Sequence, residues 1–186
     1  MFSKIINHEE LSKILSDSCK ENNIEANISN YLINKYQKAY LVLKTDKYYN
    51  SLSFKNDEKT PPSTDCLILV KCNKQNCYDL YLIELKNINK PKRFEVENIK
   101  DKFKTVIDDF MESRFKDIFN NEKYCKFNCY FITNPYGFKG TQEEYDKKIK
   151  TKGLKLDSFN SMKPLVFNKK VTMIKSILPN PIIESC

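Results

Sequence analysis

Hydrophobic and polar residues follow two different periods along the chain, and together these periods predict an α/β fold. Segments 8–23 and 93–119 repeat their apolar residues at the spacing of an amphipathic helix. Segment 28–38 predicts a further, shorter helical stretch. The apolar stripes of the first and last of these helices consist of Leu11, Ile14, Leu15 and Cys19, and of Val96, Ile99, Phe103, Val106, Ile107 and Phe110.

Shorter segments rich in β-branched and aromatic residues predict the strands. The polar segment 50–64, which contains Pro61 and Pro62, predicts a loop between two of them. The resulting order is helix, three strands, helix, strand, followed by a basic tail. The predicted strands span 39–45, 65–71, 78–86 and 125–133, with one or two closing strands inside 164–178.

Composition and charge narrow the class of protein. The 186 residues are 40% hydrophobic and 12% aromatic, which is typical of one folded domain. The net charge of +8 favours an anionic partner such as nucleic acid. An AT-rich genome would produce the same lysine-rich chain, because Arg93 and Arg114 are its only arginines. No apolar run of membrane-spanning length and no signal-peptide pattern is present, so we expect a soluble, cytoplasmic protein.

The cysteines are seven in number and irregularly spaced. An odd, irregular set favours reduced thiols in the cytosol over a disulfide framework. The segments "CNKQNC" and "CKFNC" offer a second interpretation, because they contain four potential zinc ligands, although their spacings are not the usual C-x-x-C. These four residues are Cys72, Cys77, Cys125 and Cys129.

The segment "DCLILVKCNKQNCYDLYLIELK" predicts a hairpin whose register brings charged side chains together. A four-residue turn, "NKQN", would place Cys72 opposite Cys77. Counting back along both strands then puts Asp65 directly opposite Glu84. Facing residues share one side of a sheet, with Cβ atoms about 4.5–5.5 Å apart. Lys86, two residues after Glu84, shares that side as well.

Two facing carboxylates repel each other unless a positive charge neutralises them. A nearby lysine reduces this repulsion, and a divalent cation reduces it further. Hard oxygen ligands suit Mg²⁺, which proteins often hold with one or two carboxylates plus phosphate oxygens and water. Such a cation polarises a phosphoryl oxygen, and an adjacent ammonium stabilises the developing negative charge. The predicted cluster therefore contains the groups that phosphodiester hydrolysis requires.

The arrangement Asp65 … Glu84-Leu85-Lys86 resembles the signature of the PD-(D/E)xK nuclease superfamily, which includes restriction endonucleases and Holliday-junction resolvases. The resemblance implies a restriction endonuclease-like core, with a mixed central sheet flanked by helices. This core would span about residues 8–133 of a single domain, 1–186, and segment 134–186 would be a variable extension. One departure is Thr64, which precedes Asp65 where the superfamily often has proline.

By the same resemblance, Asp65, Glu84 and the backbone carbonyl of Leu85 would bind Mg²⁺, with Mn²⁺ as a substitute. Lys86 would orient or activate the attacking water, and Glu9 or Glu10 could supply an extra acid. The only histidine, His8, is expected to start a helix rather than act as a base. Basic residues that could contact phosphates, or simply be solvated, are Lys90, Lys92, Arg93, Lys147, Lys148, Lys150, Lys152 and Lys155.

We therefore expect a Mg²⁺-dependent DNA endonuclease. The preferred interpretation is a type II restriction endonuclease that acts on double-stranded DNA as a homodimer. Attack by water in line with the leaving oxygen would leave a 5′-phosphate, as the resemblance implies. A junction-resolving or repair nuclease is the alternative among enzymes. A non-catalytic nucleic-acid-binding protein is the alternative from a different class. In that protein Glu84 and Lys86 would form only a structural ion pair.

Overall fold

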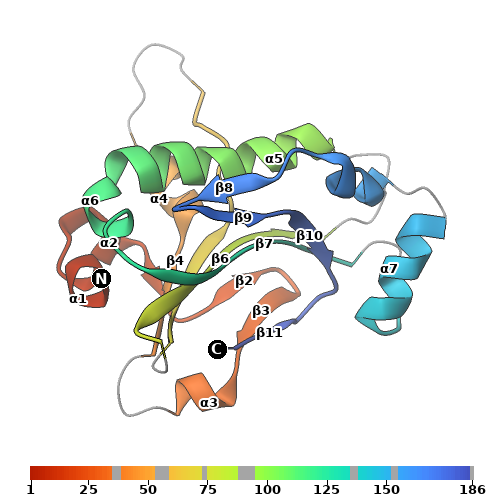
Figure 1. Cartoon of the computed structure of the whole chain (residues 1–186), viewed down its shortest axis with the longest axis horizontal. Coiled ribbons are helices and arrows are strands. Elements are labelled where there is room, and N and C mark those ends of the chain that lie inside the picture. Colours follow the sequence, from red (N-terminus) through yellow and green to blue (C-terminus); the bar gives the residue numbers. More distant parts are fainter. Residues whose placement is uncertain are drawn as a thin grey trace.

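A six-stranded sheet lies at the centre of the molecule (Figure 1). The computed structural model describes residues 1–34, 39–52, 59–72, 75–87, 95–134, 138–151 and 155–184. In spatial order the strands of the central sheet are β1 (Leu15–Ser16), β4 (Tyr40–Leu43), β5 (Cys66–Cys72), β6 (Cys77–Lys86), β7 (Tyr124–Thr133) and β10 (Ile174–Ile177).

The sheet is mixed, as the sequence predicts. Strands β1, β4, β5 and β6 pair in antiparallel fashion, whereas β7 and β10 join in parallel orientation. The short turn between β5 and β6 permits only antiparallel pairing. The long connection from β6 to β7 contains a helix, and such a crossover is what parallel neighbours require. The protein is therefore a mixed α/β protein with helices against its central sheet.

The two faces of the sheet are covered by different layers. On one face, Leu80 and Leu82 of β6 pack into a core with Phe103 and Phe110 of the long helix. On the other face, Ile83 packs into a second core with a small three-stranded sheet. Burial on both faces explains why these strands are almost continuously apolar in sequence. The small sheet consists of β2 (Cys19–Glu21), β3 (Ile24–Ile28) and β11 (Ile182–Ile183).

The long helix predicted over 93–119 is confirmed where the structure describes it. It begins as α5 (Val96–Thr105), continues as the π-helical stretch η2 (Val106–Arg114), and ends with α6 (Lys116–Phe119). The Phe115 amide donates to the Phe110 carbonyl at 3.0 Å, which is the five-residue spacing of a π-helix. Figure 1 shows this helix crossing above the central sheet.

The prediction of one helix over 8–23 is wrong beyond Lys13. Helix α2 (Glu9–Lys13) ends there, and residues 15–21 form β1 and β2 instead. Asn22 has a φ of 50° at the turn into β3, a backbone conformation that asparagine tolerates better than most residues. The apolar residues read as a helical stripe are buried instead by these short strands. His8 caps α2, as expected, by accepting a hydrogen bond from the Glu10 amide.

Other segments depart from the prediction in length. The helix expected over 28–38 is α3 (Asn30–Ile33), and 35–38 lie outside the described residues. Helix α4 (Thr45–Ser51) precedes and slightly overlaps the predicted loop. The tail contributes strand β10 to the central sheet beside β7. The remaining elements are α1 (Phe2–Ile6), α7 (Gln142–Thr151), η4 (Lys155–Ser161), β8 (Leu165–Phe167) and β9 (Lys170–Thr172).

Disulfides replace the reduced thiols that we expected: Cys72 is disulfide-bonded, and two further disulfides join pairs of described residues. One joins Cys19 to Cys66 and the other joins Cys77 to Cys125. Each links strands that are neighbours only in three dimensions, which is why the spacing along the chain gave no sign of them. None of the helices within the described ranges combines the length and apolar character that crossing a lipid bilayer requires.

Candidate active site

The register of the β5–β6 hairpin is the one that the sequence predicts. Cys72 faces Cys77 and Cys66 faces Ile83, so Asp65, directly before β5, lies at the level of Glu84. The Asp65 carboxylate also accepts a hydrogen bond from the Leu85 amide, with 2.6 Å between Oδ2 and nitrogen. This contact ties the acid to β6. The prediction that strand pairing brings Asp65 to the Glu84–Leu85 end of β6 is confirmed.

The segment before Asp65 is held by the start of α4. The Thr45 hydroxyl donates to the Thr64 carbonyl, and both threonines are fully buried. The backbone of Thr64 is therefore held by a side-chain hydrogen bond. This anchor holds the entry into β5 and with it the position of the Asp65 carboxylate.

Glu84 is a buried acid with one oxygen paired and one not. Only 2% of the residue is exposed, although acidic side chains are almost never fully buried without a partner. Its Oε1 atom lies 2.6 Å from Nζ of Lys102 on α5. Its Oε2 atom is buried and accepts no hydrogen bond within the described part of the chain. Glu84 thus presents one carboxylate oxygen without a hydrogen-bond partner near a second acid.

Burial raises the pKa values of both acids, and the charge of Asp65 further raises the pKa of Glu84. For Asp65, burial raises the pKa to about 6, against the opposing effects of the Leu85 amide and Lys102. For Glu84, burial and then the Asp65 charge raise the pKa to about 8, while Lys102 and Lys86 oppose the shift. Asp65 and Glu84 therefore interact as a pair. Near neutral pH the pair holds a proton that a divalent cation can replace.

Lys102 is the functional candidate that the sequence analysis missed. Burial alone would lower the pKa of this lysine, but the Glu84 carboxylate outweighs burial and the pKa is raised. A signal was present, because Lys102 lies three residues after Ile99 and four before Val106, inside the apolar stripe of the long helix. A charged residue within such a stripe requires a partner, and the partner is Glu84.

Lys86 is the last residue of β6 and is half-buried. It lies two residues after Glu84, on the side of the sheet that carries α5, and opposite Thr133 of β7. Its positive charge lowers the pKa of Glu84, as expected for an ammonium in the same cluster. The Lys86 side chain thus belongs to the same charged cluster as Glu84, and its role in orienting water stays a prediction.

The extra acid expected from the first helix does not join this site. The Glu9 carboxylate pairs with Lys13 at 3.3 Å, and the Glu10 carboxylate lies 3.5 Å from the Tyr48 hydroxyl. Across the described ranges, no third acidic side chain gathers with Asp65 and Glu84 within reach of one cation. A cation held here would take its remaining ligands from backbone, water or substrate.

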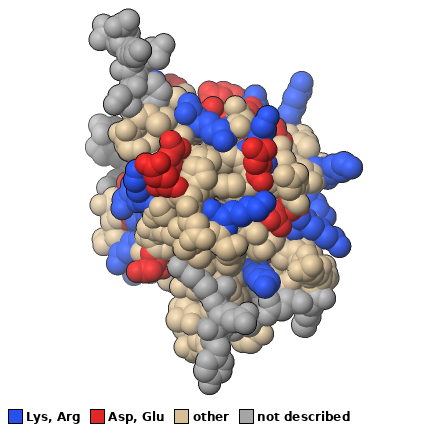
Figure 2. All heavy atoms as spheres, turned by 90° about the vertical axis from the view of Figure 1, so that its left-hand side faces the viewer, with Lys and Arg blue, Asp and Glu red and all other residues tan. Residues whose placement is uncertain are grey.

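The predicted basic residues have several different surroundings. Segment 88–94, with Lys90, Lys92 and Arg93, lies outside the described residues, as do Lys152 and the side chain of Lys155. Lys147 pairs with Glu143 at 3.0 Å, and Lys148 lies 4.8 Å from the centre of the Phe138 ring. Figure 2 shows that lysines, arginines and acids are interspersed on the face that it presents, with no continuous basic band there.

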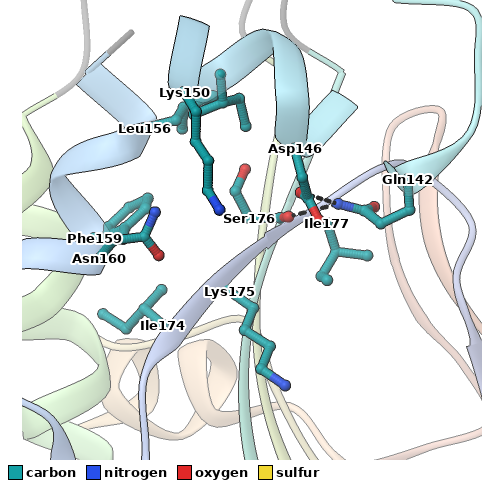
Figure 3. A pocket seen from close by; sticks show the side chains of 11 residues that line it. Gln142, Asp146, Lys150, Leu156, Phe159, Asn160, Ile174, Lys175, Ser176 and Ile177 are labelled. Carbon is teal, nitrogen blue, oxygen red and sulfur yellow. Dashed lines mark hydrogen bonds between the residues drawn. The ribbon is translucent and has the colours of Figure 1, made fainter. Parts of the chain in front are cut away.

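Lys150 borders a cavity of about 420 Å³ between α7, η4 and β10 (Figure 3). Its side chain reaches toward Asn160 across the cavity. Ser176, which also lines the cavity, lies opposite Phe131, and Phe131 lies opposite Glu84. The cavity is therefore two strands away from the acid pair at the same level of the sheet, a separation of about 10 Å.

Comparison with models of protein families, with curated proteins and with solved structures gave no match for this chain. The functional argument therefore depends on the residues and their geometry.

Proposed function

We propose that this chain is a Mg²⁺-dependent DNA endonuclease, and that it acts as a type II restriction endonuclease. The observation that carries the proposal is the pairing of half-buried Asp65 with buried Glu84, both of which have raised pKa values. An acid pair in a site containing Lys86 and Lys102 supports a role in binding a cation next to a phosphate. Perturbed acids are concentrated at functional sites, although structural networks also produce them.

The donor set suits Mg²⁺ and, as a substitute, Mn²⁺. Asp65, the free Oε2 atom of Glu84 and the Leu85 carbonyl would be its protein ligands, all of them hard oxygen donors. The chemistry that the ion supplies at such a site is Lewis-acid polarisation of a phosphoryl oxygen. The remaining steps depend on the protein side chains.

The two lysines would have different tasks. Lys102, held 2.6 Å from Oε1 of Glu84, lowers the pKa of that carboxyl group against the effect of burial and fixes its orientation. Lys86 is not held in this way by Glu84, so its ammonium is available to position water and to stabilise charge on the phosphate during attack. In this proposal Lys102 is a positioning residue and Lys86 is the catalytic lysine.

The arrangement of elements supports a restriction endonuclease-like core. The antiparallel strands β4, β5 and β6 lead through α5 to the parallel strand β7, and the acids lie on β6 and at the start of β5. The α5 helix covers the face on which Glu84 lies. The extension beyond residue 134 would then be an addition to this core that continues its sheet.

Cleavage of both strands of a DNA duplex would require two such sites, and we infer a homodimer for this reason. A dimer with two-fold symmetry matches a DNA site that has the same symmetry. A junction-resolving or repair nuclease would use the same acids on branched or damaged DNA. No specific observation favours either alternative over restriction.

The test is cleavage of a sequenced supercoiled plasmid with Mg²⁺ by the full-length protein. Discrete fragments that disappear with Asp65→Ala or Lys86→Ala would support a restriction enzyme. Preferential cleavage of four-way junctions would favour a resolvase instead. DNA retardation without cleavage, with and without Mg²⁺ or Mn²⁺, would overturn the proposed activity and leave a binding protein.

A further inference from the structure

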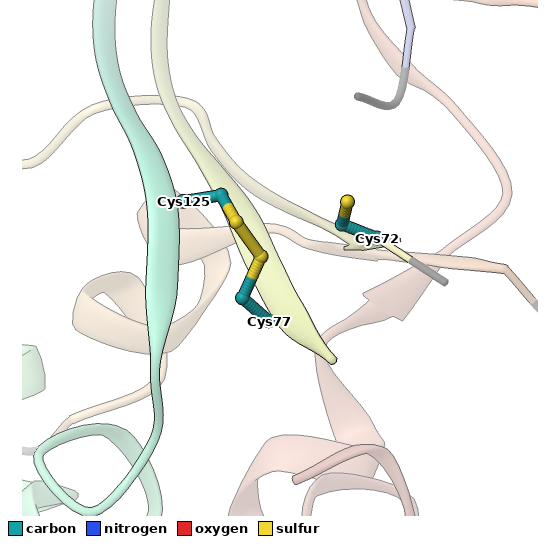
Figure 4. A group of neighbouring side chains, drawn as sticks. All are labelled: Cys72, Cys77 and Cys125. Carbon is teal, nitrogen blue, oxygen red and sulfur yellow. A yellow bond between two sulfur atoms is a disulfide. The ribbon is translucent and has the colours of Figure 1, made fainter. Parts of the chain in front are cut away.

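Three cysteine sulfurs gather near the turn of the β5–β6 hairpin, on the opposite side of the sheet from the acid pair (Figure 4). The Sγ atoms of Cys72, Cys77 and Cys125 all lie within 4.8 Å of one another. Cys72 ends β5 and Cys77 begins β6, and they face each other in the hairpin register. We call these three residues the cysteine triad.

An irregularity in strand pairing brings Cys125 into the triad. Tyr78 pairs with Tyr124 and Asp79 pairs with Lys126, so Cys125 is an extra residue in β7. Such a bulge turns a side chain away from the regular alternation. Cys129, four residues later, lies instead in the core beneath α5 and is the one cysteine with a free thiol among the described residues. The fourth zinc ligand that the sequence suggested is therefore elsewhere.

We propose that the cysteine triad binds one soft divalent cation, of the Zn²⁺ class, when all three of its cysteines are reduced, and that it loses this cation on reoxidation. Thiolates arranged tetrahedrally about 2.3 Å from Zn²⁺ lie about 3.8 Å from each other. After reduction the Cys77 and Cys125 sulfurs would separate to this distance, with the Cys72 sulfur already within 4.8 Å of both. Three protein ligands leave a fourth position for water or an outside ligand.

The redox step is balanced by a thiol reagent. A dithiol transfers two electrons and two protons to the Cys77–Cys125 disulfide, its S–S bond breaks, and the dithiol closes into a disulfide. Cys72 is also disulfide-bonded, so a second equivalent frees its thiol. Zn²⁺ then displaces the thiol protons into water. Two equivalents of a small-molecule disulfide then accept the four electrons, are reduced to thiols, re-form both protein disulfides and release the metal.

The test uses the full-length protein, reduced with a phosphine, freed of metal with a chelator, and titrated with Zn²⁺ against a chromophoric chelator. We expect one Zn²⁺ per reduced chain, none per oxidised chain, and release on adding a small-molecule disulfide. Co²⁺ in place of Zn²⁺ should give thiolate-to-metal absorption. Cys125→Ser, at the most exposed of the three positions, should abolish stoichiometric binding, whereas the control Cys129→Ala should retain it.

A second measurement covers the case in which Cys125→Ser fails to fold. Alkylation of the reduced wild-type protein, followed by mass spectrometry, should show Zn²⁺ protecting Cys72, Cys77 and Cys125 but leaving Cys19 and Cys66 unprotected. Substoichiometric binding by the wild type, equal binding by a folded Cys125→Ser variant, or the absence of selective protection would each overturn the proposal. The result does not depend on nuclease activity.

Discussion

The two ends of the β5–β6 hairpin carry different kinds of metal-binding atoms. The open end holds the carboxylates of Asp65 and Glu84 on the face covered by α5. The turn end holds the sulfurs of the cysteine triad around Cys77. One register produces both groups, since pairing Cys72 with Cys77 also sets Asp65 beside Glu84. Hard oxygen donors suit Mg²⁺ and soft thiolates suit Zn²⁺, so the two proposed sites would select different metals.

The largest effect is expected from neutralising the acids at the open end. Asp65→Asn and Glu84→Gln keep the shape but remove the charges that would bind Mg²⁺. Loss of about 4 kcal/mol of transition-state stabilisation would slow plasmid cleavage roughly a thousandfold. Asp79→Asn, which changes a buried acid of β6 on the opposite face, is the control for folding. If a folded Glu84→Gln variant cleaved DNA at an unchanged rate, Glu84 would have no catalytic role.

Lys86→Ala should have the next largest effect on cleavage. Removing a group that stabilises charge in the transition state typically costs about 100- to 1,000-fold in rate. Retention of plasmid in a gel-shift assay with Ca²⁺ should be nearly unchanged, because the acids and the fold are intact. If DNA binding fell as much as cleavage, Lys86 would be a phosphate contact rather than a catalytic lysine.

Lys102→Ala should reduce stability in a pH-dependent way. At pH 9, above the raised pKa of Glu84 (about 8), the variant leaves an ionised, buried carboxylate without its partner. Breaking such a pair costs about 3 kcal/mol. At pH 6 Glu84 is already protonated, so Lys102→Ala should reduce the free energy of unfolding by less. Urea unfolding at the two pH values measures the difference, and an equal loss at both would contradict the assigned ion pair.

The stability of the metal-free protein should fall as pH rises through this range. The folded-state pKa values of Asp65 (about 6) and Glu84 (about 8) exceed the ordinary values of 3.8 and 4.5 for these side chains. The folded state therefore binds more protons than the unfolded state, and the stability present at low pH is lost between about pH 4 and pH 8. Mg²⁺ should raise Tm more at pH 8 than at pH 5. In Glu84→Gln, both the stability and the Mg²⁺-induced rise in Tm should depend less on pH.

The two ends of the hairpin should behave independently. Seven residues of extended strand separate Asp65 from Cys72, a distance of about 23 Å. Substitutions this far apart combine additively to within about 0.5 kcal/mol, or roughly twofold. Cys125→Ser should thus leave Mg²⁺-dependent cleavage nearly unchanged, and Asp65→Asn should leave Zn²⁺ binding unchanged. A larger cross-effect in either direction would show that the ends are coupled.

The smallest effect is expected at the cavity beside the acid pair. Lys150→Gln removes one positive charge that could contact a DNA phosphate. The slope of log affinity against log salt should fall by about 1, with little change in the rate of cleavage at saturation. Lys13→Gln on α2 is the matched control, since Lys13 is exposed and paired with Glu9. Equal slopes for both variants would place the cavity outside the DNA interface.

The hairpin was predictable because its information is local. The apolar runs before Lys71 and Lys86 and the four-residue turn define one register, and that register placed Asp65 near Glu84. The long helix was predictable for a similar reason, through its repeated apolar stripe. Helix 8–23 was predicted wrongly because Leu11, Ile14, Leu15 and Cys19 fit a helical period, while the short strands that bury the later residues depend on partners far along the chain.

The amino-acid sequence alone determined which side chains the hairpin presents at each end, because strand alternation and turn length depend only on neighbouring residues. Tertiary structure decided which groups those side chains meet. Lys102 reaches Glu84 only because α5 packs across the sheet, and Cys125 reaches Cys77 only because β7 pairs in parallel with a bulge. Contacts between distant segments depend on the packing of whole layers, which no local pattern encodes.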